Sequence, residues 1–543
     1  MTQPGAFGVA KFTNDREHYD SNAYKEAELR DEFLSHLLDI LGWDSFHKRS
    51  SGYMEREVLS EVSLTVDGSA KAPDYGLALG GRTRYFIEAK KPAVNIAQDK
   101  RPAFQLRRYC WTAKLPYGFV TDFETVAIYD CRQRPTPDDS AATARVAYLE
   151  IENLEEYWDV LHGMFSRQSV ENGVLDQLAA REVPPSGTQP IDVAFLAEIK
   201  DWRRRLASDI ARQNLDLSNL EVNSATQRLI DRIVFLRIAE ANGLEAPGEL
   251  KETAEEGPAV YQRFVGLFRR ADDRYNSGIF HFNGDDDGVD ALGLNLQVSD
   301  NVLLHIVSRL YYPEPYEFSV MPPDILGRIY EQFLSEHIVV AEDRSVAVEL
   351  KPEYRKSGGV YYTPSPIVDY IVQETIGPML EDKDPAQLRR EGFSVVDPAS
   401  GSGSFLIAAF NYLLDWHRNY WADKPRLSEK FLEKGRNGQI RVKTDERKRI
   451  LTDHIFGVDI DPQAVEVTKL SLLLIVIEGQ QQQEFTLGRL LPSLEKTSSA
   501  ATASSDPTSR CPSISPRQKL CSTTLSPGKT GSLTSSPAGV STQ

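Results

Sequence analysis

Two carboxylates and a lysine lie close together near the N-terminus, in a stretch whose alternating polarity is typical of short β-strands. Asp74 precedes the segment YGLAL, and Glu88 and Lys90 are two residues apart at the end of RYFIEAK. Side chains two apart on a strand share one face of the sheet. Two-metal phosphodiester hydrolysis needs carboxylates that hold Mg²⁺ and a cation that helps to orient or activate the attacking water. This stretch supplies both kinds of group.

The turn between these two strands decides whether Asp74 joins that face. A three-residue turn beginning at Gly80 would pair Leu79 with Thr83. Asp74 would then fall opposite Glu88, whereas a two-residue turn would place it on the other face. We therefore predict the three-residue turn, with its bulge.

Pro73-Asp74 followed by Glu88-Ala89-Lys90 resembles the PD-(D/E)xK nuclease motif. The resemblance implies that Asp74 and Glu88 are catalytic and bind Mg²⁺, and that Lys90 is catalytic and assists the water. The alternative is a surface hairpin with a chance E-x-K, because E-x-K alone is a very weak signal.

Residues outside the hairpin add to this resemblance. Gln105 and Tyr109 match a Q-xxx-Y element of restriction-subunit nucleases, and Glu32 matches an acidic position on their first helix. Together with the Pro-Asp pair and the strand context, they favour a nuclease over a chance hairpin.

A second group of residues is typical of a nucleotide-like cofactor site. The segment VVDPASGSGSF (395–405) indicates a strand, a glycine turn and a helix start, and IFGVDIDP (455–462) is a strand that ends in acids. Glycines let the backbone approach a ligand closely, and an acid accepts hydrogen bonds from ribose hydroxyls. Asp397, Gly401, Gly403 and Asp459 should therefore converge at the carboxyl edge of adjacent parallel strands. The alternative is another nucleotide-binding α/β fold, although a Rossmann dehydrogenase would need a glycine where Leu406 stands.

This second group resembles the D-P-A-C-G-S-G-x-F signature of DNA N6-adenine methyltransferases, with Ser400 in place of the usual cysteine. Upstream, GVYYTP (359–364) matches their G-x-Y-Y-T-P element. The resemblance implies that S-adenosylmethionine is the cofactor, with its ribose on Asp459. The cofactor-binding residues that it implies are Tyr362, Thr363, Pro364, Asp397, Pro398, Gly401, Gly403, Phe405 and Asp459.

The elements that would position these residues follow from the periodicity of apolar side chains. Residues 24–42 have helical spacing, and residues 58–130 indicate short strands interrupted by a helix near residues 103–113. Residues 132–147 are turn-rich, and residues 191–340 are mostly helical. The clearest helices of that region are expected over residues 192–214, 223–242 and 324–336.

Composition sets broad limits. A chain of 543 residues with 41% hydrophobic and 26% charged residues is ordinary for a soluble globular protein of roughly two to four domains. The net charge of −17 argues mildly against DNA binding but does not decide it, because a basic cleft can lie on an acidic protein. We expect a cytoplasmic protein without a membrane partner, since the sequence has no membrane-spanning run, secretory signal or paired cysteines.

Some sequence elements that are typical of the methyltransferase family are not found in this sequence. The sequence contains no N-P-P-Y, D-P-P-Y or S-P-P-Y tetrapeptide, the element that in the family holds the flipped adenine. We also expect this chain to lack the family's target-recognition domain. Residues 497–543 are dominated by Ser, Thr, Pro and Ala, which predicts disorder. Family members commonly continue with N-I-K-C-G-N-S-L-I-G-P-D-F, and one encoding of it, read one base later, gives TSSAATASSDPT, the sequence of residues 497–508. We expect a frameshift near Lys496; a genuine Ser/Thr/Pro-rich tail is the alternative.

From residue 24 to residue 496 the chain resembles a combined, type IIG-like restriction–modification enzyme. The resemblance implies an α/β multidomain fold that acts on double-stranded DNA with Mg²⁺ and S-adenosylmethionine, although methyl transfer by this chain is not expected. The expected parts are a restriction-endonuclease-like α/β/α domain (1–165), a helical connector (190–345), a partial Rossmann-like methyltransferase domain (350–496) and a disordered tail (497–543). Two alternatives stay open: a methyltransferase whose N-terminal domain binds DNA without cutting it, and a non-catalytic remnant.

Overall fold

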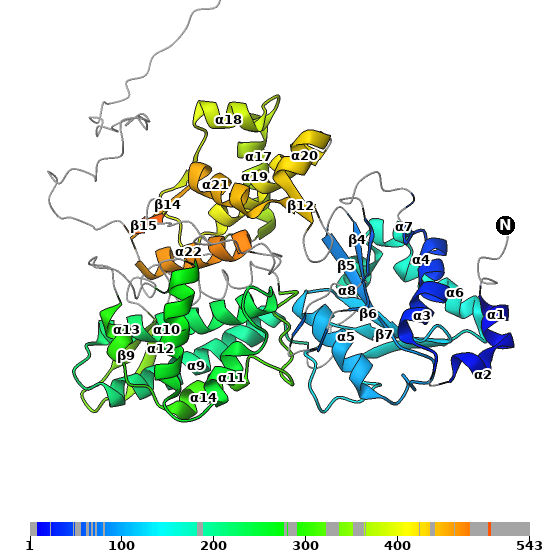
Figure 1. The fold of residues 1–543 in the computed structure, drawn as a ribbon, viewed down its shortest axis with the longest axis horizontal. Helices are drawn as coiled ribbons and strands as arrows, with labels where there is room; N and C mark the ends of the chain where they lie inside the picture. Colours follow the sequence, from blue (N-terminus) through cyan, green and yellow to red (C-terminus); the bar gives the residue numbers. More distant parts are fainter. Residues whose placement is uncertain are drawn as a thin grey trace, which may run out of the picture. The chain divides into compact units, whose positions relative to one another are not determined.

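The protein is described from a computed structural model (Figure 1). The described residues are 8–21, 23–46, 48, 56–60, 65–66, 69–70, 73–79, 82–181, 188–275, 280, 290–321, 336–350, 363, 365–422, 424–434, 440–460, 462–477 and 498–500.

The N-terminal part contains a six-stranded sheet. Its strands in spatial order are β1 (Val58–Ser60), β4 (Tyr75–Leu79), β5 (Arg82–Ala89), β6 (Tyr117–Thr121), β7 (Thr125–Asp130) and β8 (Arg145–Glu150). Neighbouring strands are antiparallel except β5 and β6, which are parallel. A parallel pair needs a crossover connection, and α5 (Lys100–Thr112), the helix predicted near residues 103–113, supplies it. A separate small hairpin joins β2 (Thr65–Val66) and β3 (Ser69–Ala70).

Both faces of this sheet pack against helices because its side chains alternate. Tyr85 and Ile87 of β5 lie in a cluster with the N-terminal helices, whereas Phe86 lies in a second cluster with α5. Gly118 on β6 allows α5 to approach closely, since a Cβ there would lie 2.8 Å from Cys110 Sγ. The helices on the first face are α1 (Val9–Asn14), α2 (Arg16–Tyr19), α3 (Glu26–Leu29), the π-helical turn Arg30–Leu34, α4 (Ser35–Ile40), α6 (Leu154–Phe165), α7 (Arg167–Glu171) and α8 (Val174–Arg181).

The first-face cluster extends beyond the predicted domain boundary at residue 165. Val170 of α7 and Leu175 of α8 are buried in it. The helix predicted over residues 24–42 is present, but the π-helical turn divides it. Strand β8 begins at Arg145, within the stretch that was predicted to be turn-rich.

The hairpin of β4 and β5 differs from the prediction in its turn. Leu79 pairs with Arg82 rather than with Thr83, so the predicted three-residue turn is wrong. The physical reason is that the strand absorbs the one-residue shift elsewhere, as a bulge between Leu77 and Ala78.

This bulge restores the register that the turn was expected to provide. Tyr75 pairs with Ile87 at the far end of the hairpin. Asp74 precedes Tyr75 and Glu88 follows Ile87, so the two acids come opposite each other.

The middle of the chain is helical and ends in a hairpin. Its helices are α9 (Ile191–Gln213), α10 (Asn219–Ala241), α11 (Glu249–Glu255), α12 (Val260–Tyr275), α13 (Ala291–Asn295) and α14 (Asp300–Ser308), followed by strands β9 (Glu336–Val340) and β10 (Val346–Leu350). Helices α9 and α10 confirm two predictions, although α10 begins earlier than residue 223 because Ser218 and Glu221 form a capping box. The helix predicted over residues 324–336 lies outside the described residues, apart from Glu336 in β9.

The last described part is an α/β unit with a parallel sheet in the order β11-β14-β15. Its elements are α17 (Ser365–Leu380), α18 (Pro385–Glu391), β11 (Val395–Asp397), α19 (Ser404–Ala422), α20 (Pro425–Phe431), β12 (Leu432–Lys434), β13 (Ile440–Val442), α21 (Thr444–His454), β14 (Ile455–Asp459), α22 (Pro462–Ile477) and β15 (Ser498–Ala500). None of the described helices is long and apolar enough to cross a membrane.

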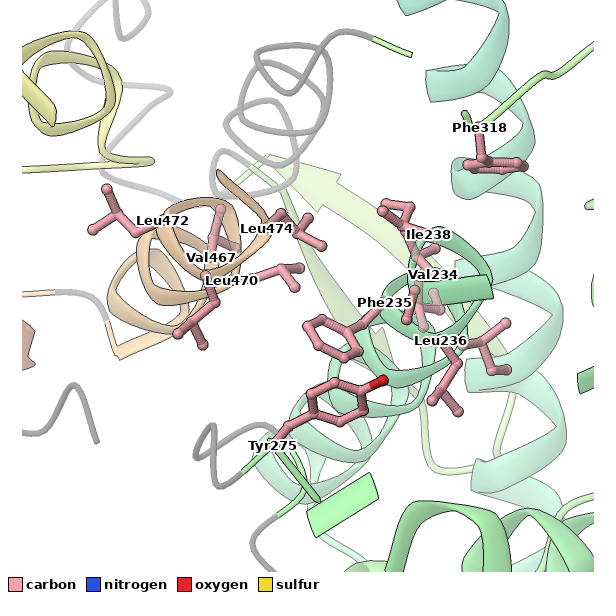
Figure 2. Packing of buried hydrophobic residues seen from close by; sticks show 14 of the residues in the cluster. Val234, Phe235, Leu236, Ile238, Tyr275, Phe318, Val467, Leu470, Leu472 and Leu474 are labelled. Carbon is pink, nitrogen blue, oxygen red and sulfur yellow. The ribbon is translucent and has the colours of Figure 1, made fainter. Parts of the chain in front are cut away.

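Helix α22 belongs to a hydrophobic core that it shares with the helical middle of the chain. Leu470 and Leu474 of α22 lie in one buried cluster with Phe235 of α10 (Figure 2). Complete burial of one leucine side chain stabilises a fold by about 1.5–3 kcal/mol. The core therefore fixes the helix that follows the acidic strand β14.

Strand β15 corrects the prediction for the tail. Residues 498–500 pair in parallel with β14, so the disorder predicted from residue 497 is wrong for these three residues. Strand pairing uses backbone N–H and C=O groups, and an open strand edge accepts a polar segment without any apolar side chain.

Candidate functional sites

The N-terminal sheet brings Asp74, Glu88 and Lys90 together at the end of β5. Lys90 Nζ lies 2.6 Å from Glu88 Oε1 and 3.8 Å from Asp74 Oδ2. The Ala89 backbone N–H donates to Asp74 Oδ2 at 2.7 Å, which holds Asp74 against β5. Only 12% of the Asp74 side chain, 1% of Glu88 and 18% of Lys90 are exposed, so the three charges interact in a largely desolvated place.

Two further charged residues complete this group, and sequence reasoning missed both. Glu26 Oε2 lies 3.3 Å from Lys90 Nζ, and Arg30 Nη1 lies 3.2 Å from Asp74 Oδ1. They are four residues apart, a spacing that places side chains on one helix face. That spacing is visible in the sequence, but nothing local pairs the helix with the strands. The five residues Glu26, Arg30, Asp74, Glu88 and Lys90 are named the N-terminal charge cluster.

Burial changes the ionisation of the cluster. It raises the pKa of Glu88 to about 8 although Lys90 opposes the shift, and it raises the pKa of Asp74 to about 6 against Lys90 and Arg30. Burial alone would lower the pKa of Lys90, but the carboxylates of Glu88, Asp74 and Glu26 outweigh it and raise that pKa. The lysine therefore stays protonated, while the two acids hold protons more readily than they do in water.

The other residues of the nuclease resemblance are placed differently. Tyr109 is buried and its ring lies edge-on to Phe86, on the sheet face that α5 covers, while Gln105 is half-buried. Glu32 forms an ion pair with Lys11 at 3.0 Å. In the described structure it is thus Glu26, not Glu32, that the first helix contributes to the charge cluster.

One carboxylate oxygen of the cluster is a candidate ligand for Mg²⁺. Glu88 Oε2 is buried and accepts no hydrogen bond in the described structure. Among the described residues, no group of three or more His, Cys, Asp or Glu side chains is arranged to hold a metal. Mg²⁺, however, retains several waters and binds through one or two protein carboxylates. Asp74 and Glu88 fit that requirement, with Glu88 Oε2 as the oxygen that lacks a partner.

The glycine turn and the acidic strand end meet at the carboxyl edge of the parallel sheet. Strands β11 and β14 pair with Asp397 opposite Gly457. Asp459, two residues further along β14, accepts a hydrogen bond of 2.8 Å from the Gly401 backbone N–H. This contact joins the two segments on which the predicted cofactor site depends.

The turn itself is shaped by backbone conformation. Asp397 Oδ1 accepts a hydrogen bond from Ala399 N at 3.1 Å, which starts the turn directly after β11. Gly401 and Gly403 have φ angles of +52° and +84°, a region that side chains rarely adopt. A Cβ on Gly403 would also lie 2.7 Å from Thr468 Cγ2. Only glycine meets both conditions at position 403.

Thr468 on α22 is a positioning residue of this turn that sequence reasoning missed. Its hydroxyl is fully buried and donates to Gly401 O at 2.9 Å. No motif marks it, because the contact joins residues far apart in the sequence through the packing of α22.

The remaining predicted cofactor residues are only partly described. Tyr362 and Pro364 lie outside the described residues, and Thr363 is half-buried. Pro398 is exposed, and Phe405 is a partly buried residue against the hydrophobic core. Their roles stay predictions.

One family of known proteins matches the part of the chain that contains the second site. Residues 321–500, which include the glycine turn and β14, match the family described as N-6 DNA methylase. This part of the chain is therefore similar to N-6 DNA methylases.

Relatives extend the similarity over most of the chain. It is 32% identical to the type II restriction enzyme and methyltransferase RM.Eco57I of Escherichia coli, over 90% of this chain and 48% of that protein. It is 25% identical to the adenine-specific methyltransferase BrxX of Escherichia coli O9:H4 (strain HS), over 44% of this chain and 20% of that protein. The chain is thus similar to a combined type II restriction enzyme and methyltransferase over most of its own length, and it spans about half the length of that relative.

A solved structure of a DrdV–DNA complex is also similar. It covers 87% of this chain and 38% of its own chain at 14% identity, with a TM-score of 0.29. This likeness is too weak to support a statement about either site.

Proposed function

We propose that the chain combines two parts of a DNA restriction–modification enzyme. One is the S-adenosylmethionine site of an adenine-N6-specific DNA methyltransferase, and the other is a Mg²⁺-dependent DNA endonuclease centre. The observation that carries the methyltransferase proposal is the hydrogen bond between Asp459 and the Gly401 N–H across two parallel strands. The acid and the glycine turn must be neighbours if one cofactor is to contact both.

At the proposed cofactor site, the backbone of the glycine turn would receive the methionine end of the cofactor. The left-handed turn at Gly401 and Gly403 has no side chains, so the methionine end of S-adenosylmethionine could approach it closely. Asp459 would accept hydrogen bonds from the ribose hydroxyls, because an ionised carboxylate can accept several at once. Tyr362 and Thr363 would complete the pocket, as the family resemblance implies.

At the proposed nuclease centre, Asp74 and Glu88 would hold Mg²⁺. The ion supplies an activated water and stabilises charge at the phosphate. Lys90 stays protonated, since three carboxylates surround it, and it would orient the water and the phosphate from beside the two acids. Its ammonium group now lies among the carboxylates, so it would have to shift when the ion binds.

Methyl transfer itself is not proposed for this chain. The sequence contains no N-P-P-Y-type tetrapeptide to hold the amine of a flipped adenine. We retain the proposal that the reading frame shifts near Lys496. The nucleotide sequence across that codon tests it: an in-frame N-P-P-Y in a downstream frame supports the proposal, and none in any frame contradicts it.

The cofactor proposal is tested by titrating S-adenosylmethionine into the chain in a calorimeter. Binding by the wild type, its loss in Asp459→Ala and its retention in Asp453→Ala would support the site. Asp453 is a suitable control because it lies close by in the sequence, on α21, and is exposed. No binding by the folded wild type would contradict the proposal.

The nuclease proposal is tested by nicking of supercoiled plasmid. Nicking should require Mg²⁺ and should be abolished by Asp74→Ala and by Lys90→Ala. Nicking that survives both substitutions would come from another site or from a contaminant.

A further inference from the structure

Arg30 contributes a mostly buried positive charge to the N-terminal charge cluster from an unusual turn of helix. It begins the π-helical turn Arg30–Leu34, and such turns interrupt α-helices rarely and often at functional sites. Its guanidinium lies 3.2 Å from Asp74 Oδ1, and only 15% of its side chain is exposed. Its carbonyl oxygen accepts a hydrogen bond from the Tyr75 hydroxyl at 3.3 Å, which ties the turn to β4.

When all five groups of the N-terminal charge cluster are ionised, its carboxylates outnumber its cations by one. Glu26, Asp74 and Glu88 supply three carboxylates, and Arg30 and Lys90 supply two cations. Metal binding requires ionised carboxylates. A cluster loaded with one divalent cation therefore carries one unbalanced positive charge, and burial makes that charge costly unless an anion joins it.

We propose that Arg30 is a positioning residue that makes metal binding depend on a DNA phosphate. The inference rests on the proposed nuclease function and deepens it. With Arg30 present, the loaded cluster becomes neutral only when a phosphodiester, which carries one negative charge, is bound as well. Without Arg30, the metal alone would neutralise the cluster, and metal and DNA would bind independently.

The test measures Mn²⁺ binding by calorimetry, in the absence and in the presence of a short DNA duplex. The wild type should bind Mn²⁺ about tenfold more tightly with DNA than without it. Arg30→Ala and Arg30→Gln should bind Mn²⁺ about tenfold more tightly than the wild type without DNA, and should show little further gain with DNA. Arg30→Lys, which keeps the charge, should retain the coupling.

A matched control separates this effect from loss of structure. Arg132 is 16% exposed and forms an ion pair of 2.6 Å with Asp130, so its environment is similar. Asp130 pairs with Tyr117 at the start of β6, whereas β5 next to the cluster pairs with the end of β6. Arg132→Ala thus removes an equivalent ion pair at the opposite end of the sheet and should leave the coupling unchanged.

Each outcome decides the inference. It is overturned if Arg30→Ala and Arg30→Gln keep the wild-type coupling, if Arg132→Ala loses it equally, or if the wild type binds no Mn²⁺. If the wild type shows coupling that depends on Arg30 but never nicks plasmid, the inference stands and the nuclease proposal fails. If the wild type nicks plasmid but shows no coupling between Mn²⁺ and DNA, the nuclease proposal stands and the inference fails.

Discussion

The N-terminal charge cluster and the glycine turn are built in opposite ways. The cluster is a set of charged side chains from one hairpin and one helix, and burial raises the pKa values of Asp74 and Glu88. The glycine turn is a set of backbone groups in left-handed conformation, joined to one carboxylate on a neighbouring strand. Chemistry on a phosphate requires strong local charge, whereas a bound cofactor requires space and hydrogen-bond partners.

This difference predicts how each site responds to substitution. The cluster should be sensitive to the charge of its side chains and to pH. The turn should be sensitive to any added Cβ and to the packing of α22 behind it.

The largest expected effect tests whether the two sites are independent. Asp74→Ala should reduce nicking by on the order of a thousandfold and leave the affinity for S-adenosylmethionine within about twofold. Asp459→Ala should weaken the cofactor by about a hundredfold and leave nicking unchanged. Parallel nicking and calorimetric assays of both variants check this. Loss of both functions in either variant would contradict independence.

Two glycine-to-alanine substitutions test whether the turn at Gly403 depends on the absence of a Cβ. Gly403→Ala should lower the free energy of unfolding by about 3 kcal/mol, because it adds strain at φ +84° and a clash with Thr468. Gly392→Ala is the matched control: its φ is +66° but nothing lies within 4 Å, so about 1 kcal/mol is expected. Urea unfolding of the two variants measures the difference, and equal losses would show that the close approach of α22 is unimportant.

The raised pKa of Glu88 predicts a pH dependence of stability. Between its ordinary value of 4.5 and about 8, the folded chain holds a proton on Glu88 that the unfolded chain has released. Stability should therefore fall as pH rises through this window. Between pH 5 and pH 8 the wild type should lose on the order of 3 kcal/mol more than Glu88→Gln, which cannot titrate. Identical slopes in urea unfolding would mean that Glu88 ionises normally.

The smallest effect concerns the support of the turn. Thr468→Val keeps the shape of the side chain but removes the hydrogen bond to Gly401 O. The loss of one such bond costs about 1 kcal/mol, so the affinity for S-adenosylmethionine should fall roughly fivefold. Thr452→Val on α21 should leave the calorimetric affinity unchanged, because the bonds that its hydroxyl makes among the described residues lie within its own helix. An effect of similar size in both variants would show that the Thr468 hydrogen bond does not specifically support the cofactor site.

The sequence predicts the local parts of both sites better than their long-range contacts. The opposition of Asp74 and Glu88 was expected from strand periodicity combined with a three-residue turn. The acids do come opposite each other, but through a bulge between Leu77 and Ala78 that no turn residue marks. Glu26, Arg30 and Thr468 could not be found in this way, because each contacts a residue distant in sequence. Such contacts depend on how elements pack, and periodicity does not encode packing partners.

The proposed cofactor site is tested most directly by photo-crosslinking labelled S-adenosylmethionine to the folded chain and mapping the labelled peptides. The label should lie within residues 395–405 or 455–460, and Asp459→Ala should remove it. A label that maps reproducibly to another part of the chain, or that persists in Asp459→Ala, would contradict the convergence of the glycine turn and β14 on one cofactor.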